Sequence, residues 1–310
     1  MAEAELHDGA VIDLTVDGTG PTLLLPVNPH PAEGSRADEL RRWGMDPALG
    51  RTLIDGLRND FRVVAFDYEG HVLANPKPDT LTPDNLASDL LAVADAVDAQ
   101  QFAYYGYSWL ALSGLQLALR TDRLSALVMG GFPPLHGPYA EMLRVTMTTY
   151  EMSIAARHKP ASAEPTPTPA TAPAGTADPT TDTSTDQPDW STVEMTLNEA
   201  QTRQFVTLYQ ALQGFDDRTA QARLTCPRLC FAGSADIIQY DENWGDVRVD
   251  LAGPLVRHRA EIEAYGWTVQ VLDGLDHTQA MQPASVLPVL RPWLTEALAA
   301  CREGAPRRTA

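Results

Sequence analysis

Three side chains of this sequence could together carry out nucleophilic catalysis: Ser108, Asp236 and His277, in that order along the chain. A serine hydroxyl is a weak nucleophile until a nearby imidazole accepts its proton. The His277 base would return that proton to the leaving group, while Asp236 would orient the ring and stabilise the imidazolium. These residue types in this order predict acyl chemistry through a covalent acyl-enzyme intermediate.

Ser108 lies in the stretch FAYYGYSWLALSG, where a β-rich run meets a helical pattern. A tight strand-to-helix turn would lift the Ser108 hydroxyl out of a sheet, and Gly106 fits because a side chain there would clash. The Trp109 N–H at the helix start would be free to donate to an oxyanion. Position 110 is Leu where the Gly-x-Ser-x-Gly turn has its last glycine. That glycine serves packing, so we expect Leu110 to shift the helix or widen the turn and to leave the nucleophile in place.

Asp236 and His277 each follow a predicted strand, after PRLCFAG and WTVQVLDG respectively. Active sites of open parallel sheets lie at the carboxyl ends of the strands, so both side chains are expected at the same edge as Ser108. Asp241 is the next candidate for the acid that supports His277. Taken singly, Ser108 could be a helix cap and Asp236 a solvated loop acid, but their joint placement favours the triad.

Strand and helix patterns alternate along most of the chain and predict an α/β fold with a mostly parallel, doubly wound sheet. The helical pattern is clearest in TPDNLASDLLAVADAVDAQ, where apolar residues recur every three or four positions. At the N-terminus, AVIDLTV and PTLLLPV are joined by DGTG, which predicts a β-hairpin between these two runs.

The alternation is interrupted between residues 139 and 222, which we interpret as a helical lid inserted into one core formed by residues 1–138 and 223–310. Within it, the segment at about 159–189 is rich in Pro, Thr and Ala and lacks large apolar residues, which predicts flexibility. The lid contributes Met147 and other apolar residues whose spacing fits helix packing at least as well as a pocket.

Two further stretches make the chain resemble the α/β-hydrolase fold family over nearly its whole length. VVAFDYEGH resembles the family strand that ends in an Asp-x-Arg-Gly turn, with Glu69 where Arg is usual. LLLPVNPHP resembles the oxyanion-loop strand, with Pro26 and Val27 replacing the usual His-Gly. The resemblance implies that the backbone N–H of Asn28 joins that of Trp109 in the oxyanion hole.

An Asn in the oxyanion loop and a Trp after the nucleophile also resemble haloalkane dehalogenases and epoxide hydrolases. Those families attack with an aspartate, which leaves an ester that water can cleave. A serine attacking the same substrates would leave an ether, a dead end. Ser108 therefore favours acyl chemistry over dehalogenation or epoxide opening.

The expected substrate is a small apolar acyl compound: an ester, a thioester or an activated amide. Candidate pocket residues are Val27, His30, Tyr107, Phe132 and Met147. The same triad could instead serve acyl transfer, cyclisation, C–C cleavage or cofactor-free oxidation, and a homologue that only binds a small molecule is a third possibility. Transfer would be favoured over hydrolysis in a dry pocket, because water must reach the acyl-enzyme.

Composition excludes several partners. The formal net charge of −18 makes nucleic acid an unfavourable partner, because phosphate backbones are repelled. No apolar stretch is long enough to span a membrane, and the acidic N-terminus does not resemble a secretion signal, so a cytoplasmic location is expected. The three cysteines fit no zinc-binding spacing, and the predicted chemistry needs neither metal nor organic cofactor. The oligomeric state is left open.

Overall fold

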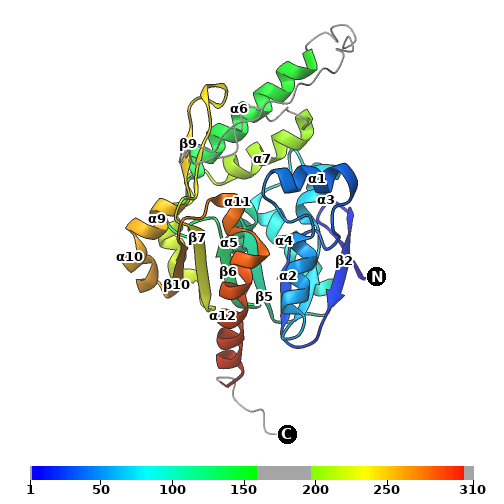
Figure 1. Cartoon of the computed structure of the whole chain (residues 1–310), viewed down its shortest axis with the longest axis vertical. Coiled ribbons are helices and arrows are strands. Elements are labelled where there is room, and N and C mark those ends of the chain that lie inside the picture. Colours follow the sequence, from blue (N-terminus) through cyan, green and yellow to red (C-terminus); the bar gives the residue numbers. More distant parts are fainter. Residues whose placement is uncertain (1, 159–196, 304–310) are drawn as a thin grey trace, which may run out of the picture.

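The computed structural model describes residues 2–158 and 197–303. Its main sheet has eight strands in the order β1-β2-β4-β3-β5-β6-β7-β10 (Figure 1). They are β1 (Ala2–Glu5), β2 (Val11–Asp17), β3 (Thr22–Leu25), β4 (Arg62–Ala65), β5 (Phe102–Tyr107), β6 (Leu124–Gly130), β7 (Arg228–Gly233) and β10 (Trp267–Leu272). β2 pairs antiparallel with both β1 and β4, whereas the other pairs are parallel. The predicted mostly parallel sheet is confirmed.

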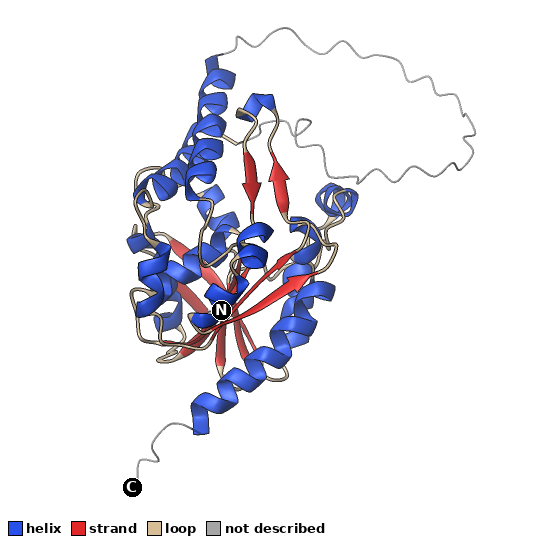
Figure 2. Cartoon of the chain, turned by 90° about the vertical axis from the view of Figure 1, so that its left-hand side faces the viewer, coloured by secondary structure: helices blue, strands red, loops and turns tan. Residues whose placement is uncertain are grey.

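Helices cover both faces of this sheet (Figure 2). They are α1 (Gly34–Arg42), α2 (Leu49–Leu57), α3 (Tyr68–Ala74), α4 (Pro83–Ala96), α5 (Trp109–Ala118), α6 (Tyr139–His158), α7 (Glu199–Ala211), α8 (Asp217–Ala220), α9 (Ala252–Arg257), α10 (Arg259–Ala264), α11 (His277–Ala280) and α12 (Pro283–Glu303). Successive strand residues enter opposite cores, since Tyr104 packs with α4 and α5 while Tyr105 packs with α2 and α12. None of the described helices has the length and apolarity needed to cross a bilayer.

The predicted N-terminal hairpin is wrong. β2 and β3 do not pair with each other, because β4 lies between them in the sheet. The glycines of the DGTG stretch instead allow the chain to pass closely under the loop that precedes β4. A Cβ on Gly18 would lie 2.2 Å from the Arg58 carbonyl oxygen, and one on Gly20 would lie 2.7 Å from that of Asp60. The glycines serve a close backbone approach rather than a two-strand turn.

Two structures rise above the carboxyl edge of the sheet (Figure 1). One is the packed pair α6 and α7, and the other is a hairpin of β8 (Ile237–Gln239) and β9 (Arg248–Asp250), which sequence patterns did not predict. The hairpin contacts α6, and the indole N–H of Trp244 donates to the Thr149 hydroxyl of that helix at 3.1 Å. That residues 139–222 form a separate lid stays a prediction, and its segment at about 159–189 lies outside the described residues.

α7 is tied to the core through its glutamines. The Gln204 amide donates to the Val72 carbonyl at 3.0 Å and accepts from the Lys77 backbone N–H at 3.0 Å. The Gln201 amide donates to the Leu73 carbonyl at 2.7 Å. These bonds satisfy buried backbone groups at the end of α3, so α7 is held over the segment that follows β4.

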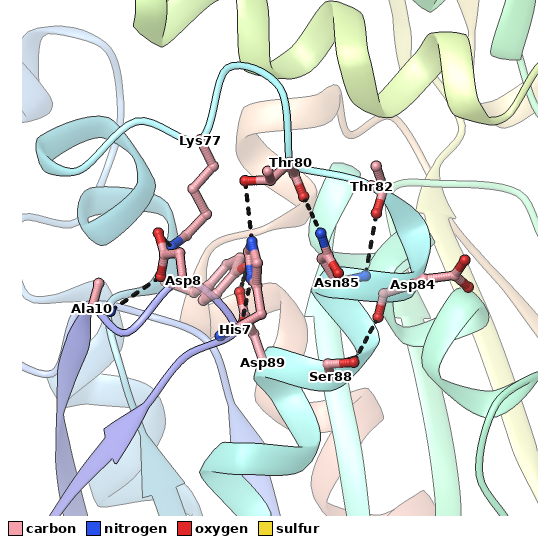
Figure 3. Close-up of polar contacts among 11 residues, drawn as sticks. His7, Asp8, Ala10, Lys77, Thr80, Thr82, Asp84, Asn85, Ser88 and Asp89 are labelled. Atoms are coloured by element: carbon pink, nitrogen blue, oxygen red, sulfur yellow. Dashed lines mark hydrogen bonds and ion pairs between the residues drawn. The ribbon is translucent and has the colours of Figure 1, made fainter.

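A buried polar cluster joins the β1–β2 turn to the loop after α3 (Figure 3). The Lys77 ammonium forms an ion pair with Asp8, and its side chain has no solvent exposure while that of Asp8 is 30% exposed. Beside it, the His7 backbone N–H donates to Asp89 at 2.7 Å, and the Tyr68 hydroxyl donates to the same carboxylate at 2.7 Å. An enclosed ammonium needs its counterion, because an uncompensated buried charge is costly.

Asp8→Asn is therefore expected to lower the free energy of unfolding by about 3 kcal/mol at pH 7, since it leaves the Lys77 charge enclosed and unpaired. Burial alone would raise the pKa of Asp8, but the Lys77 hydrogen bond and charge bring it below its ordinary value. The stabilisation is then present above the unfolded pKa and is lost as pH falls through the folded one. The difference between wild type and variant should hold down to about pH 5 and shrink below about pH 4.

Urea unfolding across this pH range measures the effect. The matched control is Asp95→Asn, which removes the 62% exposed partner of an ion pair with Arg123. Exposed pairs contribute less than about 1 kcal/mol, so the control should change stability little. Equal losses in the two variants at pH 7 would contradict the role given to the Asp8–Lys77 pair.

Candidate active site

Ser108 occupies the turn between β5 and α5, with φ 57° and ψ −129°. A positive φ is rare for a side chain other than glycine, and such strain persists only where the surroundings enforce it. The Ser108 N–H donates to the Gly130 carbonyl of the neighbouring strand at 2.8 Å, and its own carbonyl accepts from Ala111 at 2.9 Å. The turn is thus held on both sides, and the first N–H of α5, at Trp109, has no intrahelical acceptor.

The glycine pattern around this turn has a steric explanation. A Cβ on Gly106 would lie 2.3 Å from the Leu110 carbonyl oxygen, so only glycine fits two residues before Ser108. That carbonyl also accepts from the Tyr104 hydroxyl at 2.8 Å, which ties the helix start to β5. Close helix–strand packing occurs one turn later, where a Cβ on Gly114 would lie 2.6 Å from the Tyr104 ring. Leu110 is accommodated because Gly114 provides the close contact.

Asp236 and His277 form a hydrogen-bonded pair. The Nδ1 atom of His277 lies 2.9 and 3.0 Å from the two carboxylate oxygens of Asp236. Asp236 is fully buried, and burial raises its pKa while the hydrogen bond from His277 lowers it, with a net rise above the ordinary value. Asp241, the alternative acid, instead accepts from the Asn243 backbone N–H at the tip of the β8–β9 hairpin.

Backbone contacts bring the two loops of this pair together. The Ala235 N–H donates to the Leu275 carbonyl at 3.0 Å, and the Ser234 N–H donates to the Leu272 carbonyl at 2.8 Å. A Cβ on Gly233 would lie 2.0 Å from the Leu275 oxygen, so glycine at the end of β7 is required for this approach. The Tyr107 hydroxyl, from the residue before the serine, donates to the His277 carbonyl at 2.8 Å. His277 is therefore held both by the loop after β7, through Asp236, and by the end of β5, through Tyr107.

Asn28 lies in the loop after β3. Its side-chain oxygen accepts from the His30 backbone N–H at 2.9 Å, which forms a compact turn. A Cβ on Gly50 of α2 would lie 1.9 Å from the Asn28 carbonyl oxygen, so α2 packs directly against this loop. The helix thereby sets the path of the loop even though the usual glycine is replaced by Val27.

These groups share one cavity of about 460 Å³. Its wall includes the predicted residues Val27, Asn28, His30, Tyr107, Ser108, Trp109 and His277. Phe132 and Met147, which were also predicted for the pocket, are not among the residues that line this cavity. Phe132 is buried and packs its ring against Tyr139 with 5.9 Å between centroids, while Met147 is 40% exposed on α6. Phe132 thus packs at the start of α6, and Met147 lies on the exposed side of that helix.

Glu69 is a cavity residue to which the sequence patterns assigned no role. Its side chain is exposed along the cavity wall, and its Oε1 atom accepts from the Trp109 indole N–H at 3.2 Å. The surrounding protein desolvates the carboxyl and raises its pKa, an effect that the Trp109 hydrogen bond partly offsets and the Asp67 charge reinforces. The departure from arginine in the DYEG stretch was the signal that could have identified it.

His136, His258 and Glu261 bring three potential metal ligands within 4.8 Å of one another, away from this cavity. Arg218 already forms an ion pair with Glu261 and donates to the His136 ring at 3.1 Å. The Arg218 guanidinium would repel a metal cation, and it already occupies ligand lone pairs of His136 and Glu261. We therefore interpret the group as a surface ion-pair network.

Comparison with solved structures finds 701 similar chains, whereas no family model and no curated protein matches the sequence. An esterase from Thermogutta terrifontis is 16% identical with a TM-score of 0.52, covering 95% of this chain and 98% of its own. An enzyme whose structure explains recognition and ring-cleavage of the Pseudomonas quinolone signal is 14% identical with a TM-score of 0.58. The match covers 97% of this chain and 100% of that enzyme. An enol-lactonase from Burkholderia xenovorans is 14% identical with a TM-score of 0.52, covering 94% and 99%.

Proposed function

We propose that this chain, which has the α/β-hydrolase fold, is a serine hydrolase that cleaves an ester, thioester or activated amide of a small apolar acyl substrate. One observation carries the proposal. A serine with a positive φ at the strand-to-helix turn shares a cavity with a histidine whose Nδ1 atom is bonded to a fully buried aspartate. Nucleophile, base and orienting acid are the parts that acyl transfer to a serine requires.

In the proposed reaction, Ser108 Oγ attacks the acyl carbonyl while His277 Nε2 accepts the hydroxyl proton. The tetrahedral oxyanion binds the backbone N–H groups of Trp109 and Asn28. Collapse breaks the bond to the leaving group, which takes the proton from His277 and departs. Water then attacks the acyl-enzyme, again giving a proton to His277, and releases the acid and free Ser108. Asp236 stays ionised and accepts from Nδ1 throughout.

The cavity wall supports an apolar acyl group. It includes aliphatic and thioether side chains from α1, from α2, from the loop between them and from the residue after α11, namely Leu40, Met45, Leu49, Leu53 and Met281. A volume of about 460 Å³ lies within the range of small-ligand pockets. Such a wall stabilises a hydrocarbon chain by removing it from water.

We expect a fluorophosphonate probe to label the folded protein at Ser108, because it captures a serine activated by a base. Mass spectrometry of the labelled peptide measures the site. Ser88→Ala, which removes an exposed hydroxyl bonded to the Asp84 carbonyl on α4, is the matched control and should label fully. Labelling that persists in Ser108→Ala, or none in folded wild type, would contradict the proposal.

Other chemistry on the same triad is tested by product analysis. The fold is shared with the ring-cleaving neighbour, so a quinolone ring substrate belongs in the panel beside acyl esters and thioesters. Oxygen uptake or ring-cleavage products that depend on Ser108 or His277 would replace hydrolysis by cofactor-free oxidation. Transfer to an added amine or alcohol, with no free acid, would replace it by acyl transfer.

A further inference from the structure

The Glu69 carboxyl has only part of its bonding capacity used. Its Oε1 atom accepts from the Trp109 indole, and within residues 2–158 and 197–303 no donor bonds to Oε2 and no lysine, arginine or histidine forms an ion pair with it. A carboxylate can accept about four hydrogen bonds, so Glu69 retains acceptor capacity at the cavity wall. Because the side chain is exposed in the cavity, water can occupy this remaining capacity until a donor group of a ligand takes its place.

The other acids of the cavity differ from Glu69 in this respect. Asp46 accepts from the Ala48 N–H at 2.8 Å and, through its second oxygen, from the Thr52 hydroxyl at 2.9 Å. Asp67 accepts from the Gly70 N–H at 2.9 Å and caps α3. Both serve helix starts, whereas the contact of Glu69 is with Trp109, the residue after the proposed nucleophile. Glu69 and Ser108 line the same cavity, so a ligand held beside Ser108 occupies a space that Glu69 borders.

The charge of the cavity points the same way. Arg36 is the lone lysine or arginine among the described lining residues, and it is 65% exposed and paired with Glu39. The interior thus combines carboxylates with an apolar wall. A ligand carboxylate would meet like charge in a site of reduced solvation, while an ammonium, a hydroxyl or an amide N–H would find an acceptor.

We propose that Glu69 selects the substrate, so that the cavity takes acyl compounds carrying a hydrogen-bond donor, cationic or neutral, and rejects those carrying a carboxylate. This deepens the proposed function and rests on it. Glu69 Oε2 accepts from the donor while Trp109 holds Oε1. Because Trp109 also supplies the first N–H of α5, the donor-bearing group is positioned relative to the oxyanion hole.

The test compares the p-nitrophenyl esters of hexanoate, its terminal-hydroxyl and terminal-amino derivatives, and the half-ester of adipate. At pH 8 we expect kcat/KM to fall in the order amino, hydroxyl, methyl, carboxylate. In Glu69→Gln the ratio of amino to carboxylate ester should fall by about tenfold or more, because one hydrogen bond to a charged acceptor is lost. The control Asp95→Asn removes an exposed carboxylate that pairs with Arg123 and does not line the cavity, so it should keep the wild-type order.

A binding measurement separates this inference from the proposed hydrolysis. Calorimetry with hexylamine, hexanol and hexanoate involves no bond cleavage, so it reports on Glu69 even if esters are not hydrolysed. Wild type should bind the amine and the alcohol more tightly than hexanoate, and Glu69→Gln should narrow that difference by about tenfold. Amine and alcohol that bind wild type no better than hexanoate would overturn the inference, as would a preference that persists in Glu69→Gln. The inference would also be overturned if wild type hydrolysed the esters but their kcat/KM values did not fall in the order amino, hydroxyl, methyl, carboxylate.

Discussion

Ser108→Ala is expected to reduce kcat for the best ester by about 10⁶-fold, because the variant retains the cavity and the oxyanion donors but has no group to form the acyl-enzyme. A residual rate of about 10³–10⁴ over the uncatalysed reaction should remain, since binding and oxyanion stabilisation do not need the hydroxyl. Active-site titration and steady-state kinetics measure the loss. KM should change little, as the hydroxyl contributes mainly in the transition state.

The control for this loss is Ser88→Ala, which should keep wild-type kinetics. Folding is verified by thermal unfolding, and Ser108→Ala should be no less stable than wild type because alanine removes the hydroxyl without enlarging a core cavity. If Ser108→Ala retains more than about a hundredth of the wild-type activity, another nucleophile, or water attacking the ester directly, must carry out the reaction.

Asp236→Asn is expected to lower kcat by about 10⁴-fold. The asparagine amide presents an N–H to the ring, so Nδ1 becomes the acceptor and Nε2 carries the proton, the tautomer that cannot accept from Ser108. The effect should be seen in kcat rather than in KM. Rates measured from pH 5 to pH 9 with the best ester test it, and Asp241→Asn should behave as wild type because its carboxylate caps the hairpin tip.

Stability separates a chemical role of Asp236 from a structural one. Burial raises its pKa above that of the unfolded chain, so its ionisation opposes folding: the cost is absent below the unfolded pKa and grows as pH rises through the folded one. At pH 7 the neutral asparagine should thus lower the free energy of unfolding little or not at all. Activity lost together with several kcal/mol of stability would instead indicate that the pair is mainly structural.

Local sequence patterns could predict those features of the fold and the site whose conformation depends on residues close together in the chain. Gly106 before Ser108 follows from a clash inside a single strand-to-helix turn, and the structure places the Leu110 carbonyl where a Cβ would lie. The placement of Asp236 and His277 after strands followed from the parallel-sheet pattern. The hairpin prediction failed because turn residues indicate a reversal but not the partner: Gly18 and Gly20 serve the passage past β4.

By itself the sequence determined which side chains could react, their order along the chain and the local turn that presents Ser108. Only the tertiary structure decided what these residues meet. The 2.9 Å contact between His277 and Asp236 joins residues 41 positions apart and depends on the approach of two loops at Gly233. It also placed Phe132 outside the cavity and Glu69 within it, beside Trp109. Such contacts arise from packing between distant segments, which local propensity and spacing do not encode.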